Sequence, residues 1–183
     1  SELVKEGKVR YIGVSNETPW GVSEYLRLAR EKGYEKIVSI QNQYSLLNRT
    51  YEIGLAEMTL KNDIGLLAYS ALNMGVLSGK YLDGAKPAGA RFTIYERNQD
   101  RYNPARAQAA IKRYVELAQA HNLDPAQMAL AFAISRPFMT SVIIGTTSVE
   151  QVRMNLDAAD IVLPDDVLAE IEAIYLEFPD PTH

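Results

Sequence analysis

The strongest constraint on the fold is a pattern that occurs four times along the chain: a short apolar stretch ends in small polar residues. The stretches cover residues 7–16, 36–43, 63–72 and 141–148, and amphipathic helical patterns lie between them. Short apolar stretches that alternate with helical patterns predict βα units and a parallel sheet. We therefore expect a single α/β domain over residues 1–183.

Helix signals separate the predicted strands. The first helix is expected to begin at Thr18, an N-cap residue followed by Pro19 at the first helical position, and to end at Gly33. The second is expected to carry Ile53, Ala56 and Leu60 on one face. Further helices are expected to begin at Asn103-Pro104, at Asp124 (running to Pro137), at the capping box of Ser148 and Gln151, and near Pro164.

The connection over residues 73–102 differs from the rest of the chain. It is rich in Gly, Pro and mixed charge, shows no helical or strand period, and is longer than an ordinary connection. Such a segment is usually functional or mobile, and we expect a mobile loop here.

Polar residues follow each predicted strand. Because ligand-binding groups gather at the carboxyl ends of parallel strands, these residues are expected to lie along one edge of the sheet. At any single strand, polar residues can simply mark a solvated loop, but four in succession favour a binding site. The residues are Ser15, Asn16, Gln41, Tyr69, Ser70, Thr146 and Thr147.

Composition excludes several classes of function. The net charge of -4 and the lack of any Lys/Arg cluster longer than two residues argue against a nucleic-acid partner. There is no Cys and there are only two His, so neither a disulfide nor a metal site of recognisable spacing is expected. No apolar run approaches the roughly 20 residues of a membrane helix, so we expect no membrane association and a cytoplasmic location.

The number of βα units raises a further question. Four units cannot close an eight-stranded barrel, which requires about 250 residues. We therefore expect the first strand and the strand near Val142 to be exposed edges unless another chain pairs with them. The chain is expected to behave as half of a larger structure.

Four ordered motifs carry a family resemblance. GKVRYIGVSNE, IQNQYSLLNR, LLAYSALNMGVLSGKYLDG and IIGTTSVEQVRMNL resemble the aldo-keto reductases, in the branch of the Tas-like reductases and the potassium-channel β subunits. The resemblance covers the chain from about Leu3 to Tyr175. It implies the C-terminal half, strands five to eight, of a (β/α)8 barrel with its closing helices, and NADP(H) bound at the carboxyl ends of the strands.

The resemblance also assigns cofactor-binding roles. It places Ser15, Asn16 and Gln41 at the nicotinamide carboxamide and Tyr69 beneath the nicotinamide ring. A segment that wraps the pyrophosphate corresponds to Ser70, Ala71, Leu72, Gly75 and Leu77, with Lys80 and Arg91 as basic residues near the phosphates. The adenosine end corresponds to Gly145, Thr147, Gln151 and Asn155.

Some positions depart from the family pattern. Met154 stands where many relatives carry a Glu that contacts adenine, and Arg153 is the nearest basic residue for a 2′-phosphate. The family's catalytic Tyr, Lys, Asp and His all belong to the first half of the barrel, and His121 and His183 do not follow a strand. No catalytic residue is therefore expected in this chain.

Two functional hypotheses follow. In the first, the chain is the NADP(H)-binding half of a carbonyl reductase, which acts on a small carbonyl substrate only when another polypeptide completes the barrel. In the second, it is a non-catalytic module that self-associates or binds a partner, with weak or no nucleotide binding. Both predict association, either as a homo-oligomer or with a complementary half-barrel chain.

Overall fold

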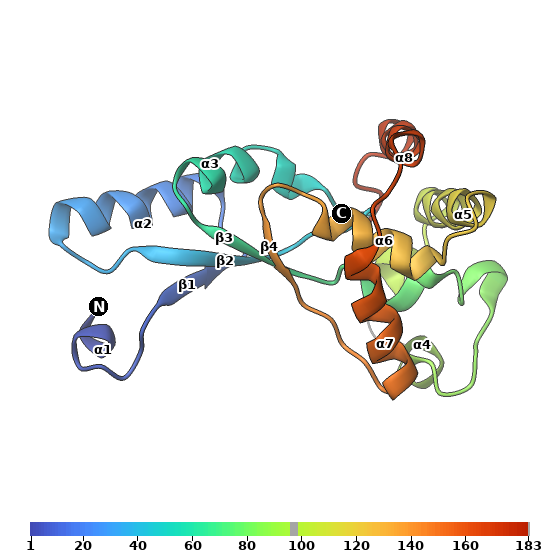
Figure 1. The fold of residues 1–183 in the computed structure, drawn as a ribbon, viewed down its shortest axis with the longest axis horizontal. Helices are drawn as coiled ribbons and strands as arrows, with labels where there is room; N and C mark the ends of the chain where they lie inside the picture. Colours follow the sequence, from blue (N-terminus) through green and yellow to red (C-terminus); the bar gives the residue numbers. More distant parts are fainter. Residues whose placement is uncertain (96–98, 183) are drawn as a thin grey trace.

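The computed structural model describes residues 1–95 and 99–182. Its centre is one all-parallel sheet in the order β1-β2-β3-β4 (Figure 1). The edges are β1 and β4, as predicted for the first strand and for the strand near Val142. The strands are β1 (Ile12–Ser15), β2 (Ile37–Gln43), β3 (Gly65–Tyr69) and β4 (Met139–Val142).

Helices connect the strands and close the fold (Figure 1). The longer ones are α2 (Pro19–Lys32), α3 (Leu55–Lys61), α5 (Ala105–Ala120), α6 (Pro125–Ile134), α7 (Val149–Asp157) and α8 (Asp165–Glu177). Single turns are α1 (Glu2–Lys5), η1 (Thr50–Glu52) and η5 (Ala158–Asp160). The alternation of strands and helices confirms the predicted α/β class, consistent with half of a (β/α)8 barrel.

Predicted capping residues explain where three helices begin or end. The Thr18 hydroxyl accepts a hydrogen bond from the Gly21 amide at 3.1 Å, and Gly33 ends α2 in the left-handed region at φ 67°. The Asp124 carboxylate accepts from two amides of the first turn of α6. At α7, the Ser148 hydroxyl accepts from the amide of Gln151 at 3.3 Å.

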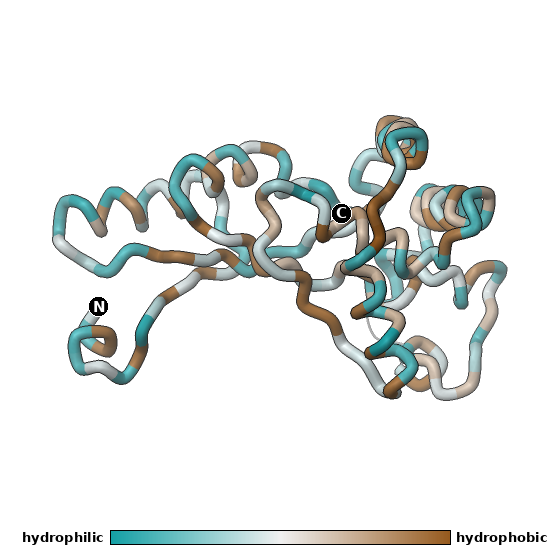
Figure 2. The backbone as a smooth tube through the Cα atoms, in the orientation of Figure 1, coloured by the Kyte–Doolittle hydropathy of each residue, from teal (hydrophilic) through white to brown (hydrophobic). Residues whose placement is uncertain are grey.

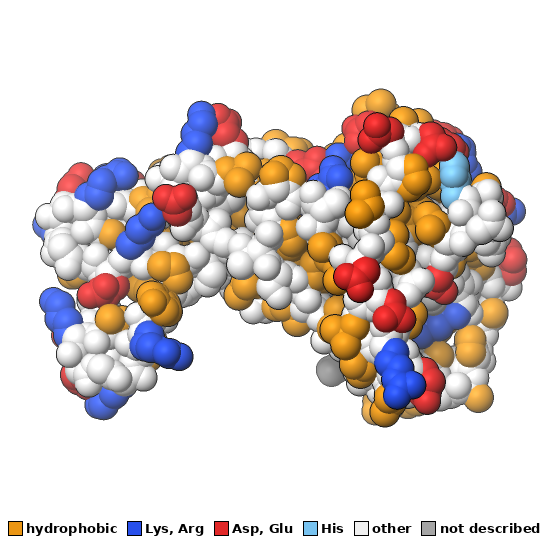
Figure 3. All heavy atoms as spheres, viewed as in Figure 1, with side chains coloured by type: hydrophobic (Ala, Val, Ile, Leu, Met, Phe, Trp, Pro, Cys, Tyr) orange, Lys and Arg blue, Asp and Glu red, His pale blue; other side chains and the backbone are white. Residues whose placement is uncertain are grey.

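The two faces of the sheet differ in burial. Leu66 and Ala68 of β3 are fully buried, whereas the alternating residues Gly65, Leu67 and Tyr69 are only half-buried. Figure 1 shows α2 and α3 along one face, and Figure 3 shows a hollow on the opposite side, between α1 and α7. One face therefore belongs to the hydrophobic core, and the other is open.

Several predicted boundaries were wrong in detail. The last strand begins two residues earlier than predicted, at Met139, and Ile143 and Ile144 follow it with about two fifths of their surface exposed. Figure 2 shows this hydrophobic stretch leading from β4 toward α7. The helix expected to reach Pro137 ends at Ile134.

The predicted face of the second helix was correct for Ala56 but wrong for Ile53 and Leu60. Ile53 precedes α3 and is 70% exposed, and Leu60 is exposed as well; the helix instead buries Leu55, Ala56 and Thr59. The buried face is set by the packing of α3 against β3 and the preceding turn, which the short apolar pattern did not fix.

The connection over residues 73–102 contains more structure than its sequence predicts. Within the described part of it lie short helical turns over Asn73–Ser78, Leu82–Gly84, Arg91–Ile94 and Asp100–Tyr102. Phe92 and Tyr102 are buried and pack together, with ring centroids 5.9 Å apart. The mobility of this segment remains a prediction.

Candidate functional site

The carboxyl ends of β1, β2 and β3 bring four predicted residues together. The Ser15 hydroxyl donates to the main-chain oxygen of Gln41 at 2.8 Å, and the main-chain N–H of Asn16 donates to the same oxygen at 3.1 Å. The Tyr69 hydroxyl donates to the Asn16 side-chain oxygen at 2.8 Å. Strand pairing places Ser15 beside Gln41, so the sheet itself builds this strand-end cluster.

Sequence reasoning missed one member of the strand-end cluster. The Asn42 side-chain oxygen accepts a hydrogen bond from the Asn16 amide at 2.9 Å. Asn16 adopts a left-handed conformation, φ 56°, which is favourable for Asn but unusual for most residues. The signal was present in the sequence, because Asn42 lies inside the polar run that ends the second strand.

The segment after β3 forms a compact turn around Gly75. Ser70, Asn73, Met74 and Gly75 all have positive φ angles, between 49° and 93°. A Cβ atom added at Gly75 would stand 3.0 Å from Cε and Nζ of Lys80, so the lysine ammonium lies directly over the glycine. The structure therefore joins two residues that the sequence had assigned to the same phosphate-binding segment.

Other residues predicted in this segment differ in accessibility. Ala71 and Leu77 are buried in the hydrophobic core, so only their main chain can reach a ligand. Ser70 and Leu72 are half-buried, and Arg91 is exposed at the start of its short helix.

The start of α7 holds the third predicted group. The Gln151 side-chain oxygen accepts from the Thr147 amide at 2.9 Å and from the Thr147 hydroxyl at 3.2 Å. In a capping box, the Gln151 side chain would accept from the amide of the N-cap residue, Ser148; here it accepts from the amide of the preceding residue, Thr147. Gly145 is exposed, whereas Asn155 is buried and its side-chain oxygen has no hydrogen-bond partner.

These three groups make their hydrogen bonds separately. Among the described residues, no hydrogen bond or ion pair joins the strand-end cluster, the Gly75 turn and the start of α7. A cavity of about 370 Å³ is lined by Val76 and Tyr81, the sequence neighbours of Gly75 and Lys80, and by Phe92, Gln99 and Gln108. Ser15, Asn16, Gln41 and Tyr69 are exposed or half-buried at the edge of the sheet, whereas three other predicted residues, Ala71, Leu77 and Asn155, are buried.

Comparison with known proteins decides the family. The family model described as "Aldo/keto reductase family" matches residues 1–176. The chain belongs to the aldo-keto reductase family. The resemblance drawn from the four sequence motifs is thereby confirmed, and family membership supports an oxidoreductase.

Individual relatives match the chain along nearly its whole length. Protein tas of Escherichia coli strain K12 is 50% identical over 181 residues, which cover 99% of this chain and 52% of that protein. An aldo-keto reductase of Babesia bovis is 32% identical over 98% of this chain. L-glyceraldehyde 3-phosphate reductase of Escherichia coli strain K12 is 31% identical over 86% of it. The chain spans about half the length of protein tas, consistent with a C-terminal half.

Aldo-keto reductases generally use NADP(H), and two observations test whether these residues fit it. The buried, unpartnered side-chain oxygen of Asn155 can accept a hydrogen bond from a ligand. At the Gly75 turn, the missing side chain lets the Lys80 ammonium lie close over the main chain, where it could contact a phosphate. Both features fit a dinucleotide with a phosphate near Lys80.

Three further observations concern metal ligands, the histidines and helix length in the described residues. No group of three or more His, Asp or Glu side chains in residues 1–95 and 99–182 could hold a metal ion. His121 lies at the end of α5, with Nε2 3.0 Å from a Glu170 oxygen, and His183 lies outside the described residues. No helix in those residues is long and apolar enough to cross a membrane.

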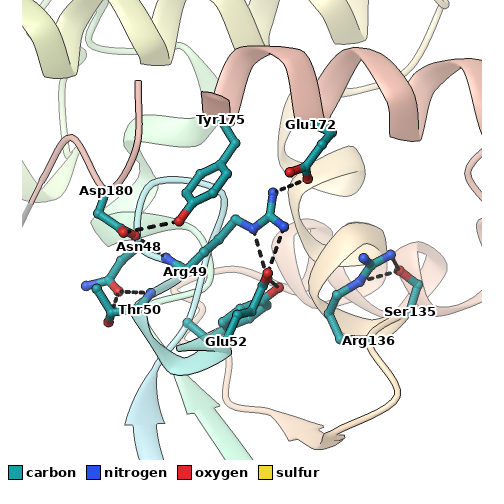
Figure 4. Close-up of polar contacts among 10 residues, drawn as sticks. Asn48, Arg49, Thr50, Glu52, Ser135, Arg136, Glu172, Tyr175 and Asp180 are labelled. Atoms are coloured by element: carbon teal, nitrogen blue, oxygen red, sulfur yellow. Dashed lines mark hydrogen bonds and ion pairs between the residues drawn. The ribbon is translucent and has the colours of Figure 1, made fainter. Parts of the chain in front are cut away.

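Sequence reasoning missed a buried ionic cluster behind the strand ends (Figure 4). Arg49 is 6% exposed and forms a two-bond ion pair with Glu52, both bonds 2.8 Å long. It also donates to Glu172 of α8 at 2.8 Å and stacks over the Tyr175 ring, 4.1 Å from its centroid. The motif IQNQYSLLNR contains this arginine, but nothing local reveals its partners.

The ionic cluster fixes the protonation of its members. Burial and the neighbouring Glu52 raise the pKa of the Tyr44 hydroxyl far above its usual range. Burial acts to raise the pKa of Glu52, but hydrogen bonds from Arg49 and Tyr44 outweigh it, and the pKa lies below its ordinary value. The Tyr44 hydroxyl is therefore a donor and Glu52 an ionised acceptor, joined at 2.6 Å.

Proposed function

We propose that this chain is the NADP(H)-binding half of a carbonyl reductase. The strand-end cluster carries the proposal, because it gathers polar groups from three neighbouring strands on the open edge of the sheet. When bound, NADPH would supply a hydride for carbonyl reduction. Ser15, Asn16 and Gln41 would orient the carboxamide of the nicotinamide, and Tyr69 would stack against its ring.

The remaining groups would bind the rest of the cofactor. Lys80 would neutralise phosphate charge above the Gly75 turn, with Arg91 as a second basic residue in the same segment. The positive end of the α7 dipole would favour a phosphate near Thr147, whose amide would have to exchange its bond to Gln151 for one to the ligand, and Asn155 offers an acceptor at the adenosine end. Met154 in place of an acidic residue would weaken adenine recognition.

We also propose that the chain is cytoplasmic and that it is catalytically inactive by itself. The family resemblance implies a catalytic Tyr with Lys, Asp and His from the first half of the barrel, and the one strand-end tyrosine of the cluster, Tyr69, has no strand-end Lys, Asp or His beside it in this sequence. We expect no NADPH consumption above the enzyme-free rate with a panel of small aldehydes. Consumption above that rate would show that a catalytic group is present after all.

A fluorescence titration tests cofactor binding directly. Trp20 is the single tryptophan, is 73% exposed, and lies in the first turn of α2, four residues after Asn16. NADPH is expected to quench it saturably in the micromolar range, more strongly than NADH. Lys80→Gln should weaken binding about tenfold or more, since it removes a charge-assisted contact, whereas Lys112→Gln on the exposed side of α5 should not.

The unpaired edges of the sheet favour a second role in association. Within the described residues, β1 and β4 each pair on one side only, and one face of the sheet is open. We propose that the chain associates, with itself or with a complementary half-barrel, so that these edges are covered. If no saturable NADPH signal appears up to millimolar concentration, this non-catalytic role becomes the better account.

A further inference from the structure

Tyr44 connects the strand-end cluster to the buried ionic cluster. Its amide donates to the main-chain oxygen of Tyr69 at 3.3 Å, and Tyr69 in turn donates its hydroxyl to Asn16. Its own hydroxyl donates to Glu52 at 2.6 Å, and Glu52 is held by Arg49. Hydrogen bonds joined through the covalent frames of Tyr69 and Tyr44 therefore connect Asn16 to the arginine.

Packing and hydrogen bonding together restrain the Tyr44 side chain. It is fully buried, and its ring packs edge-on against Phe138, with centroids 5.2 Å apart. The Phe132 ring lies nearly parallel to it, with centroids 6.3 Å apart. A buried side chain that packs against two rings and is hydrogen-bonded at its tip restrains the main chain that carries it.

The ionic cluster is anchored to the C-terminal part of the chain. Arg49 bonds Glu172 of α8, and its amide donates to the Asp180 carboxylate at 2.6 Å (Figure 4). The Thr182 hydroxyl donates to the main-chain oxygen of Leu47 at 3.0 Å. The C-terminal segment therefore immobilises the turn that follows β2, at positions more than 120 residues away in sequence.

We propose that Tyr44 is a positioning residue for the nicotinamide end of the site, with Glu52, Arg49 and the C-terminal segment holding it in place. The inference rests on the proposed function. Tyr44 touches no ligand in this account; it fixes Tyr69 through the main chain, and Tyr69 fixes the Asn16 side chain. The adenosine end on α7 lies outside this chain of bonds and is independent of it.

The test compares Tyr44→Phe with Tyr51→Phe. Tyr51 is equally buried and its hydroxyl also donates a hydrogen bond, to Thr59 at 2.9 Å, but it has no bond to the strand-end cluster. Both substitutions remove one buried hydroxyl bond and should lower stability, Tyr44→Phe somewhat more because its acceptor is an ionised carboxylate. Only Tyr44→Phe is expected to weaken NADPH binding, by about threefold to tenfold, which corresponds to part or all of one hydrogen bond.

A cofactor fragment separates positioning from general loss of structure. Affinity for 2′,5′-ADP, which lacks the nicotinamide, should change less than twofold in either variant. Equal weakening of NADPH and 2′,5′-ADP by Tyr44→Phe, or equal effects of the two variants on NADPH, would overturn the proposal.

Hydrogen exchange tests the same coupling without any cofactor. In Tyr44→Phe, amides of residues 14–17 and 41–45 should exchange faster than in the unmodified chain, while those of 149–157 stay unchanged. Unaltered exchange at 14–17 would refute the positioning role. Faster exchange there in a chain that binds no NADPH would support the coupling and reject the proposed cofactor function.

Discussion

Replacement of Arg49 by Met should strongly destabilise the fold. The Arg49 side chain is 7% exposed and its guanidinium bonds two carboxylates, so its removal leaves Glu52 partly buried without its cation. Loss of one partner of a buried ion pair costs about 3–5 kcal/mol. With a urea m-value of about 2 kcal/mol/M, the unfolding midpoint should fall by about 2 M.

A series of combined variants identifies the cause of this loss. Arg49→Met with Glu52→Leu removes both charges, and the remaining cost is the unpaired hydroxyl of Tyr44, about 1–3 kcal/mol. Adding Tyr44→Phe should bring the midpoint close to that of the unmodified chain. Glu172 is half-exposed, so Glu172→Gln should cost less than about 1 kcal/mol.

Urea unfolding followed by circular dichroism measures each variant. The physical account requires strong non-additivity, because the second and third substitutions relieve a penalty that the first creates. If the losses simply add, so that the triple variant is the least stable of the series, the buried-charge reasoning is refuted.

Three further predictions concern pH, capping and the Gly75 turn. The pKa of Glu52 is lowered in the folded state, so its contribution to stability is complete above about pH 4.3, the ordinary glutamate value, and is lost as the pH falls through the lower folded value. Between pH 7 and pH 3, the urea midpoint of Glu52→Gln should therefore fall less than that of the unmodified chain. Thr18→Ala should lower the free energy of unfolding by about 1 kcal/mol, seen as a lower Tm, because the Gly21 amide loses its cap. Gly75→Ala should cost about 1–2 kcal/mol for its left-handed backbone and should also weaken NADPH binding, because the new Cβ displaces Lys80.

Matched controls make these predictions specific. Thr18→Ser keeps a capping hydroxyl and should restore most of the stability lost in the alanine variant. Gly84 has a similar positive φ, 76°, but no atom lies within 4 Å of an added Cβ. Gly84→Ala should therefore lower stability while NADPH affinity is retained; weaker NADPH binding in this control would mean that the Lys80 contact is not the reason.

Association is the remaining expectation. The free edges of β1 and β4 predict a species heavier than the 20.4 kDa monomer in sedimentation velocity. A stable monomer at micromolar concentration would show that the edges do not pair.

The sequence by itself determined the fold class, the order of elements and most of the strand ends. Thr18, Gly33 and Asp124 act within a few residues of their own positions, so a local pattern suffices to place them. The polar residues after each strand were equally readable, because parallel strands in βα units always present their carboxyl ends on the same side. The motifs around them were sufficient to recognise the family.

Only the tertiary structure decided which of these residues meet. The Tyr69 hydroxyl bonds Asn16, 53 positions away in sequence, and Arg49 bonds Glu172, 123 positions away. At such sequence separations, local propensity carries no information. Packing also decided that Ile53 is exposed while Thr59 is buried, since burial depends on what lies opposite each face. Local chemistry thus specified the elements, and long-range packing joined them into a site with Tyr44 and Arg49 behind it.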